Sequence, residues 1–292
     1  MKIDQDAMVF TRMPEIVWLF TKRGTKVIFE CHEWFGKSEN FALYLLRDCD
    51  FIITTNRYIK QKFVDSGLAS DKMLVATNGV DLKKFYFELS KKEAIKKLNL
   101  GTGLNQLFQG KTLLLYAGSF RTMDVEKGID EILSALQILH DRNLFFVAVG
   151  GSKEDIGYYQ KISKKNGVDD QCLFVGRKNQ SILALWQKAA DMLLAPFPDK
   201  AHYKFFMTPL KLFEYMAAKR PIIVSDLPSI REILNKDSCL FCQPDNPDDL
   251  AAQIRTLLKD EALGYRLATQ AFESVKKYDW KCRVKKIMNF IN

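Results

Sequence analysis

Short apolar runs that alternate with helix-like segments are the feature that most constrains the fold of this chain. The runs have the length of buried strands, and apolar residues recur at helical spacing between them, for example over 129–139. This alternation predicts an α/β fold with helices packed on parallel sheets. The predicted strands are Val27–Phe29, Phe51–Thr54, Met73–Ala76, Thr112–Ala117, Leu144–Val149, Cys172–Val175, Met192–Ala195, Ile222–Ser225 and Leu240–Phe241.

The strands fall into two groups, and a chain of 292 residues is long enough for two domains. Three strands precede a junction at residues 79–88 and six follow it. The charged segment 90–98 after the junction predicts a helix capped by Ser90. The second group therefore forms a full α/β unit, and the first forms part of one.

A formal net charge of +9 has three candidate meanings, namely nucleic acid, an anionic membrane surface or a phosphorylated substrate. Lysines on helix faces account for most of the charge, and no interleaving of basic and aromatic residues indicates nucleic-acid binding. No apolar run is long enough for a membrane-spanning helix, and residues 1–6 carry acids where a signal peptide is apolar. The sequence thus predicts a cytoplasmic protein without nucleic-acid partners, and a peripheral contact at the inner membrane face stays open.

Six cysteines lie mostly in apolar runs, which is typical of reduced core residues. Cys239 and Cys242 have CxxC spacing but fall in a predicted strand, where positions three apart face opposite sides. A second ligand pair at zinc spacing is missing. A metal or redox site is therefore not predicted there.

The stretch from Thr208 to Pro221 has the pattern of a helix that binds a phosphate group. Thr208 is a good N-cap and Pro209 suits the first helical position. Lys211 and Glu214 lie three residues apart, on one face near the positive end of the helix dipole. Free N–H groups and a lysine would hold a phosphate, and Glu214 would accept hydrogen bonds from a ribose. An amphipathic helix with an ordinary cap is the alternative.

Several separated segments resemble the motifs of retaining glycosyltransferases of family 4, which have the GT-B fold of two facing Rossmann-like domains. They occur in family order from about Glu30 to Trp280. The donor-binding motif is Thr208–Pro221, continued by Pro221–Pro228 and Arg231–Ile233; the first phosphate loop is Tyr116–Phe120 with Lys127–Asp130; and the interdomain junction is Asn78–Asp81 with Phe85.

The resemblance implies three parts in the chain. Residues 1–86 would be a partial N-terminal, acceptor-side Rossmann-like domain, and residues 87–277 a C-terminal nucleotide-sugar-binding one. Residues 278–292 would be a helix that crosses back to the first domain. Family members have more strands before the one at Val27–Phe29, so about half of the acceptor domain is expected to be missing.

The resemblance also assigns the diphosphate contacts. Lys127 and Lys211 would stabilise the departing diphosphate, with the backbone of Gly118 close to it. Family members often carry an arginine where this chain has Ser119, and Arg121 is the nearest substitute. The N–H groups near Thr208, Pro209 and Leu210 would hold the distal phosphate.

Three further contacts follow from the resemblance. Gly176 and Arg177 match the place where the family holds the nucleotide base, with stacking by the arginine as an open alternative. His32, directly after a predicted strand, would face the transferred sugar, whereas an ordinary loop-capping histidine is the alternative. Phe206 stands where many relatives have a sugar-contacting glutamate, so sugar recognition is expected to differ.

The resemblance therefore implies a retaining hexosyltransferase that takes a UDP- or GDP-linked sugar and transfers it to a glycan or lipid-linked acceptor in polysaccharide biosynthesis. No cofactor and no metal are expected, because Asp48-Cys49-Asp50 opens a buried strand and lacks the surroundings of a metal-binding DxD motif. The alternative is a catalytically weak nucleotide-sugar-binding module that needs a partner chain for the missing half.

Overall fold

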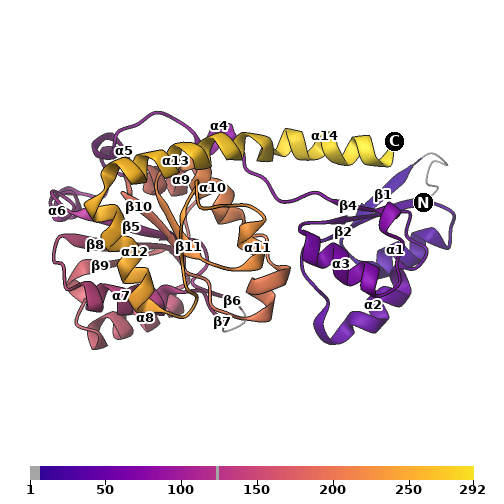
Figure 1. Ribbon diagram of the computed structural model, residues 1–292, viewed down its shortest axis with the longest axis horizontal. Helices are drawn as coiled ribbons and strands as arrows, with labels where there is room; N and C mark the ends of the chain where they lie inside the picture. The colour runs from indigo at the N-terminus through magenta and orange to yellow at the C-terminus, as the bar shows by residue number, and fades with distance from the viewer. Residues whose placement is uncertain (1–6, 123–124) are drawn as a thin grey trace. The chain divides into compact units, whose positions relative to one another are not determined.

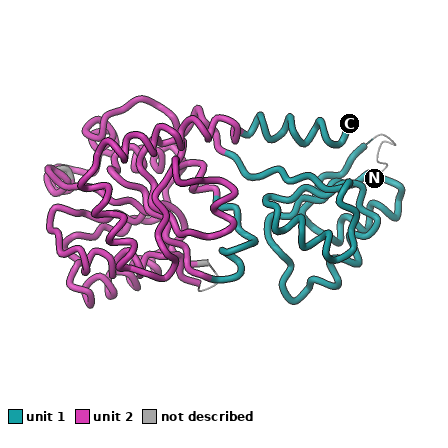
Figure 2. The backbone as a smooth tube through the Cα atoms, in the orientation of Figure 1, with its two compact units in different colours: residues 1–79, 200–209, 280–292 teal, residues 80–199, 210–279 magenta. Residues whose placement is uncertain are grey.

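The computed structural model describes residues 7–122 and 125–292 of the chain. The acidic residues in the first six positions lie outside this description. The chain forms two compact units, one of residues 1–79, 200–209 and 280–292 and the other of residues 80–199 and 210–279 (Figure 2). We call them the N-terminal and the C-terminal unit.

The N-terminal unit is built on a parallel four-stranded sheet of order β1-β2-β3-β4. In β2, Val27 and Phe29 lie in one apolar cluster, and Ile28 between them lies in another. Side chains alternate along a strand, so both faces of this sheet are covered. The strands are β1 Met8–Thr11, β2 Lys26–Cys31, β3 Phe51–Thr54 and β4 Met73–Val75; the helices are α1 Pro14–Thr21, α2 Glu39–Leu46, α3 Arg57–Asp65 and α14 Trp280–Ile291.

The last helix of the chain covers one face of this sheet (Figure 1). Ile287 of α14 is buried with Ile28, Ile53 and Ala76. The other face packs against α1, α2 and α3 through residues such as Phe63. The C-terminal helix, which sequence reasoning placed from about residue 281, begins at Trp280.

A segment from the middle of the chain also belongs to the N-terminal unit. The sequence indicated a variable loop at 199–206, and the structure forms a single π-helical turn at His202–Phe206 there. Phe206 stacks on Trp34, with ring centroids 6.2 Å apart, and Phe205 lies 5.3 Å from Tyr58. Aromatic packing therefore fixes a stretch whose sequence carries no regular periodicity.

The C-terminal unit contains a parallel six-stranded sheet of order β12-β11-β10-β5-β8-β9. Read from the first strand of the unit, β5, the chain first builds outward through β8 and β9. It then returns to the other side of β5 through β10, β11 and β12. This is the doubly wound Rossmann order, and the direction of winding changes between β5 and β10. The strands are β5 Thr112–Ala117, β8 Leu144–Gly151, β9 Cys172–Gly176, β10 Met192–Ala195, β11 Ile222–Ser225 and β12 Leu240–Cys242.

Helices pack on this sheet through amphipathic faces, as the spacing in 129–139 predicted. Ile129, Ile132, Leu133 and Leu136 of α7 are all buried in the main core. The helices are α4 Leu82–Phe85, α5 Lys91–Leu98, α6 Thr102–Leu107, α7 Ile129–Leu139, α8 Lys153–Lys165, α9 Gln180–Ala189, α10 Leu210–Ala218, α11 Pro228–Arg231, α12 Pro247–Lys259 and α13 Glu261–Val275.

Local signals in the C-terminal unit confirm one sequence prediction and add one feature. Ser90 caps α5 through a reciprocal pair of hydrogen bonds with Glu93. A short antiparallel pair, β6 Arg121–Thr122 and β7 Val125–Glu126, follows β5 and was not predicted.

Within the described residues, no helix has the length and apolarity needed to cross a bilayer.

Candidate functional site

The change of winding direction marks the place where an open α/β sheet binds its ligand, at the carboxyl ends of the strands. In the C-terminal unit this is the end of β5, followed by Gly118 and Ser119, beside the end of β10. The predicted residues Lys127, Lys211 and Glu214 belong to the segments that follow or surround these ends. The topology therefore brings the predicted diphosphate contacts of this unit to one region.

Close backbone approach shapes the floor of this region. Gly118 and Gly150 both have positive φ, +126° and +128°. A Cβ atom on Gly150 would lie 2.3 Å from the carbonyl oxygen of Gly118. One on Gly118 would lie 3.2 Å from Cε of Lys211. Glycine is required here because the ends of two strands and a lysine stem share the same space.

Lys211 is the least compensated charge of the site. Its Nζ is buried, and no hydrogen-bond partner for it exists in the described part of the chain. The ammonium lies 3.6 Å from the centroid of the Tyr116 ring and 5.1 Å from that of Phe197. Burial and the nearby charge of Lys127 lower the pKa of Lys211. Aromatic rings compensate a buried cation only partly, so the group is suited to receive an anion.

Lys127 provides a second positive charge next to Lys211. Its Nζ donates a 2.9 Å hydrogen bond to Oγ of Ser119, and burial lowers its pKa. Ser119 therefore orients this lysine. The sequence did not suggest this role, because Ser119 was noted there only as the residue that stands where relatives often have arginine. The arrangement concentrates two cations after β5, where they can bind one bridging anion.

The start of α7 is already occupied by a carboxylate of the protein. The carboxylate of Glu126 accepts hydrogen bonds from the N–H groups of Gly128 at 2.6 Å, Ile129 at 2.5 Å and Asp130 at 3.1 Å. Three N–H groups at the start of this helix are thus satisfied internally. Any phosphate near Lys127 is therefore held by the lysines and not by this helix end.

Arg121 does not supply a free charge at this site. Its Nε donates to Asp155 at 2.7 Å and its Nη2 lies 3.4 Å from Glu154. The guanidinium also stacks 4.9 Å from the centroid of the Tyr158 ring. Arg121 was the nearest substitute for the arginine that relatives carry, and here two carboxylates neutralise it.

Glu214 lies one turn into α10 and contacts a buried amide. Nε2 of Gln187 lies 3.4 Å from Oε2 of Glu214. Burial raises the pKa of Glu214 to about 7, although the hydrogen bond from Gln187 and the charge of Lys211 oppose this rise. The carboxyl group can hydrogen-bond a hydroxyl group in either protonation state.

Tyr215 is a positioning residue that sequence reasoning missed. Its hydroxyl accepts a 2.7 Å hydrogen bond from the backbone N–H of Ala117 and donates to the carbonyl of Leu194 at 3.3 Å. It thus ties α10 to the ends of β5 and β10, where the winding changes. A tyrosine on an otherwise apolar helix face was the available signal, because a buried hydroxyl needs a partner.

The predicted base contacts lie farther along the same sheet edge. Gly176 ends β9, which is separated from β5 by β8, and Arg177 follows it with an exposed side chain. The structure therefore places them at the carboxyl edge of the sheet, two strands from Gly118. Leu210 is the first residue of α10 and is exposed.

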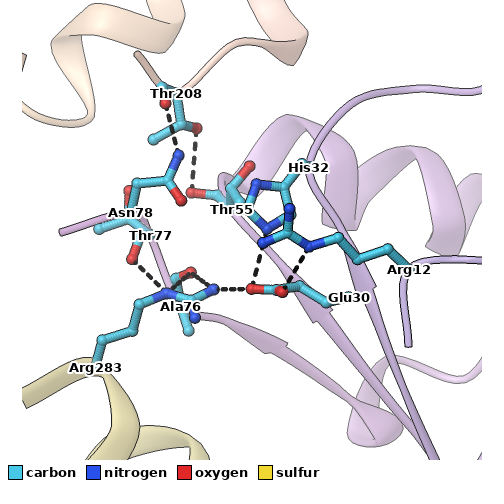
Figure 3. Close-up of polar contacts among 9 residues, drawn as sticks. All are labelled: Arg12, Glu30, His32, Thr55, Ala76, Thr77, Asn78, Thr208 and Arg283. Atoms are coloured by element: carbon cyan, nitrogen blue, oxygen red, sulfur yellow. Dashed lines mark hydrogen bonds and ion pairs between the residues drawn. The ribbon is translucent and has the colours of Figure 1, made fainter. Parts of the chain in front are cut away.

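His32, the candidate in the N-terminal unit, follows β2 and lies beside a buried carboxylate (Figure 3). Its Nε2 is 3.1 Å from Oε1 of Glu30, whose side chain is 4% exposed. Arg12 donates to the other oxygen of Glu30 at 3.1 Å, and Arg283 pairs with the first. Burial alone would raise the pKa of Glu30, but His32 and Arg283 lower it to about 2.

Arg283 anchors the C-terminal helix to this carboxylate. It comes from α14, and its guanidinium also donates to the carbonyls of Ala76 at 3.1 Å and Thr77 at 3.0 Å (Figure 3). The end of the chain thereby supports the loop that carries His32. Sequence reasoning used Glu30 only as the context of His32 and did not predict its pairing with Arg283, although a charge inside the apolar run of β2 signals a buried partner.

Thr208 and Pro209 belong to the N-terminal unit, unlike the helix that they precede in sequence. The Thr208 hydroxyl donates to the carbonyl of Thr55 at 3.3 Å and accepts from Asn56 at 3.4 Å. Asn78 donates to its carbonyl at 2.7 Å (Figure 3). These bonds hold the segment that contains Thr208 next to the residues that follow β3.

Metal-ligand geometry is not part of either region. In residues 7–122 and 125–292 no three His, Cys, Asp or Glu side chains are grouped so that they could hold a metal ion. Asp50 instead accepts a 2.8 Å hydrogen bond from the backbone N–H of Val27. Cys239 and Cys242 are buried free thiols.

Comparison with solved structures shows the fold. The chain superposes on HepE of Anabaena, crystallised with UDP and glucose, with a TM-score of 0.78 and 15% identity, covering 97% of this chain and 77% of that one. Sucrose-phosphate synthase from Thermosynechococcus elongatus gives a TM-score of 0.76 and 19% identity, covering 97% and 72%. These likenesses confirm the predicted α/β architecture of the GT-B type with two parallel sheets.

Sequence comparison gives the family. The model of the family described as glycosyl transferases group 1 matches residues 111–260, just over half of the chain, and the chain belongs to this family. The glycogen synthase of Mycobacterium tuberculosis is 26% identical over 246 residues, 82% of this chain and 53% of that protein. A phosphatidyl-myo-inositol mannosyltransferase of Mycobacterium leprae is 27% identical over 184 residues, 61% of this chain and 46% of that protein. The chain spans about half the length of the curated relatives it matches.

Proposed function

We propose that this glycosyltransferase transfers a hexose from a UDP- or GDP-linked donor to a glycan or lipid-linked acceptor with retention of the anomeric configuration. The observation that carries the proposal is the buried, unpartnered ammonium of Lys211 beside Lys127, under the glycine turn after β5. A diphosphate is the ligand that two adjacent cations at this place in a Rossmann-like unit fit best. HepE, a structural neighbour, was crystallised with UDP and glucose.

The proposed chemistry breaks the bond between the anomeric carbon and the diphosphate oxygen and forms one to the acceptor oxygen. Negative charge then develops on the diphosphate, and Lys127 and Lys211 stabilise it in a site with few other hydrogen-bond partners. The acceptor proton passes to an oxygen of the departing diphosphate. Because the lysines supply the positive charge, the reaction is proposed to need neither metal nor cofactor.

The remaining candidates have binding roles in the proposal. Glu214 accepts hydrogen bonds from the ribose, and Gly176 and Arg177 contact the base. His32 hydrogen-bonds a hydroxyl of the transferred sugar, in an orientation that Glu30 fixes. Thr208, Pro209 and Leu210 supply the segment next to the distal phosphate.

The test is a calorimetric titration of the purified chain with UDP, GDP and their hexose derivatives, followed by an assay of donor hydrolysis and transfer. One nucleoside diphosphate is expected to bind, and Lys127→Ala and Glu214→Ala are expected to weaken that binding at least tenfold. Lys161→Ala, a substitution of an exposed lysine on α8, serves as the control for lost charge. Absence of binding to every nucleotide would contradict the proposal.

A second candidate function rests on the edge of the N-terminal sheet. β1 pairs only with β2 among the described strands, and Phe10 on it is 50% exposed, next to exposed Met8 and Met13. An unpaired apolar edge suits addition of another strand. In this alternative the chain is a nucleotide-sugar-binding module that needs a partner chain, and it binds the donor without turning it over. Transfer activity of the chain alone would eliminate it.

A further inference from the structure

A second group of cations lies at the amino ends of the strands of the C-terminal sheet, opposite the carboxyl ends that carry the proposed donor site. Helices α9 and α10 run back from the carboxyl ends of their strands, and their last turns meet the amino ends of β10 and β11. A cavity of about 540 Å³ opens there, next to the segment 86–93 and helix α13. Lys188, Lys219 and Arg220 all line it. None of the residues assigned to the donor site lines this cavity.

Lys188 is the buried centre of the group. It is only 5% exposed, and its ammonium lies over the rings of Tyr86 at 5.4 Å and Phe87 at 5.7 Å. Burial, with the charges of Arg220 and Lys219, lowers the pKa of Lys188 to about 8, while Glu88 opposes this. The positive charge of this buried ammonium is therefore only partly compensated by the aromatic rings, and the two cationic neighbours add to the repulsion.

Arg220 is also incompletely satisfied. Its Nη2 donates a 2.6 Å hydrogen bond to the carbonyl of Lys188, but its Nε is buried without a partner. In the part of the chain that the structure describes, no carboxylate lies within ion-pair distance of Lys188, Lys219 or Arg220. Three cations therefore lie close together without a directly paired anion among the described residues, although Glu88 and Glu93 also line the cavity.

The third cation, Lys219, has a strained backbone conformation. Lys219 has a φ of +54°, in the left-handed region. It directly follows the last residue of α10, where glycine is the usual choice. Among the described residues, the other non-glycine residues with positive φ are Asn99, His140 and Asp245, types that tolerate this conformation better. The ammonium of Lys219 lies 5.8 Å from the centroid of the Tyr265 ring.

The walls of the cavity fit an organic body attached to the anion. Tyr86, Leu89, Tyr265 and Ala268 give aromatic and apolar surface, and Glu88 adds a hydrogen-bond acceptor for hydroxyl groups. The volume is several times that of an inorganic phosphate. We propose that this pocket binds the phosphate monoester of a small polyol or sugar, with the phosphate held by Lys188, Lys219 and Arg220.

The test is a calorimetric titration of the whole chain with glycerol 3-phosphate, inorganic phosphate and glycerol. Glycerol 3-phosphate is expected to bind more tightly than phosphate, and glycerol is expected not to bind. Lys188→Met should weaken the binding at least tenfold, whereas Lys161→Met should leave it unchanged. Lys219→Gly gives a second variant, which relieves the positive φ while removing a cation, so that weaker binding accompanies a higher melting temperature.

Two arms separate this pocket from other sources of binding. Lys211→Met should leave the affinity for glycerol 3-phosphate intact, because that lysine lies at the other edge of the sheet. Vesicles with phosphatidic acid present the same group on a lipid, and binding to them that depends on Lys188 would support the pocket and assign the source. The proposal is overturned if none of the phosphates binds, if Lys188→Met has no effect, or if Lys211→Met abolishes the binding.

Discussion

Both units bury charged groups, but among the described residues only the N-terminal unit supplies oppositely charged partners for them. In the N-terminal unit the buried carboxylate of Glu30 pairs with Arg12 and Arg283 and lies next to His32, so its charge is compensated by the protein itself. In the C-terminal unit Lys211 is buried without a hydrogen-bond partner or an ion pair in the described residues. We call the group around Glu30 the completed cluster and the group around Lys211 the incomplete cluster. The partners in the completed cluster stabilise the fold, whereas the uncompensated charge in the incomplete cluster costs stability and leaves that charge available for a ligand.

The largest effect is expected from breaking the completed cluster. Glu30→Gln removes the charge that faces Arg283, whose side chain is 11% exposed. Leaving one member of a buried pair uncompensated should lower the free energy of unfolding of the N-terminal unit by about 3 kcal/mol. Urea unfolding followed by tryptophan fluorescence measures this, since three of the four tryptophans, Trp18, Trp34 and Trp280, belong to the N-terminal unit. An unchanged midpoint would show that the cluster carries no stability.

The same cluster predicts a pH dependence of similar size. The pKa of Glu30 is lowered from 4.5 to about 2 in the folded state. Its contribution is therefore fully present above pH 4.5 and is lost as the pH falls from about 4.5 toward 2. By pH 3 the loss should amount to about 2 kcal/mol, and it should be absent from Glu30→Gln. Urea midpoints between pH 7 and 3 for both proteins test this, and parallel curves would contradict the assignment.

The incomplete cluster predicts a change of the opposite sign. Lys211→Met keeps the aliphatic stem on Tyr116 and Phe197 but removes the buried charge. The variant should be more stable than the original chain by about 1 kcal/mol, because an uncompensated charge no longer has to be buried. Thermal unfolding without nucleotide gives the comparison. A loss of stability would mean that the lysine supports the fold.

The smallest effect is expected at a surface pair, which calibrates the others. Lys22 and Asp48 lie 3.2 Å apart, and both side chains are more than half exposed. Asp48→Asn should change the free energy of unfolding by less than about 0.5 kcal/mol. A change as large as that of Glu30→Gln would show that burial does not distinguish the clusters.

Much of the fold was predictable because it depends on short-range patterns. The strands of both sheets are uninterrupted apolar runs, and Ser90 with Glu93 is a local capping signal. The spacing of Lys211 and Glu214 likewise predicts that both side chains lie on one face of α10 near its start. Parallel strands bring such segments to one sheet edge, so local patterns were enough to predict which residues of the C-terminal unit gather there.

The remaining features depend on contacts between distant parts of the chain. Glu30 and Arg283 are 253 positions apart, and Asn56 and Thr208 are 152 apart. Nothing in the sequence near residues 200–209 indicates that this segment packs with the N-terminal unit. The pairing of Arg121 with Asp155 also follows only from the place of α8 beside the loop after β5. Sequence spacing cannot distinguish a free cation from a neutralised one.

The most direct test of the central claim is a calorimetric titration of the Lys211→Met variant with the nucleoside diphosphate that the original chain binds. The account predicts an affinity at least a hundredfold lower than that of the original chain, while the corresponding nucleoside without phosphates binds equally to both. Equal affinity of the two proteins for the diphosphate would contradict the claim that this buried lysine is reserved for it.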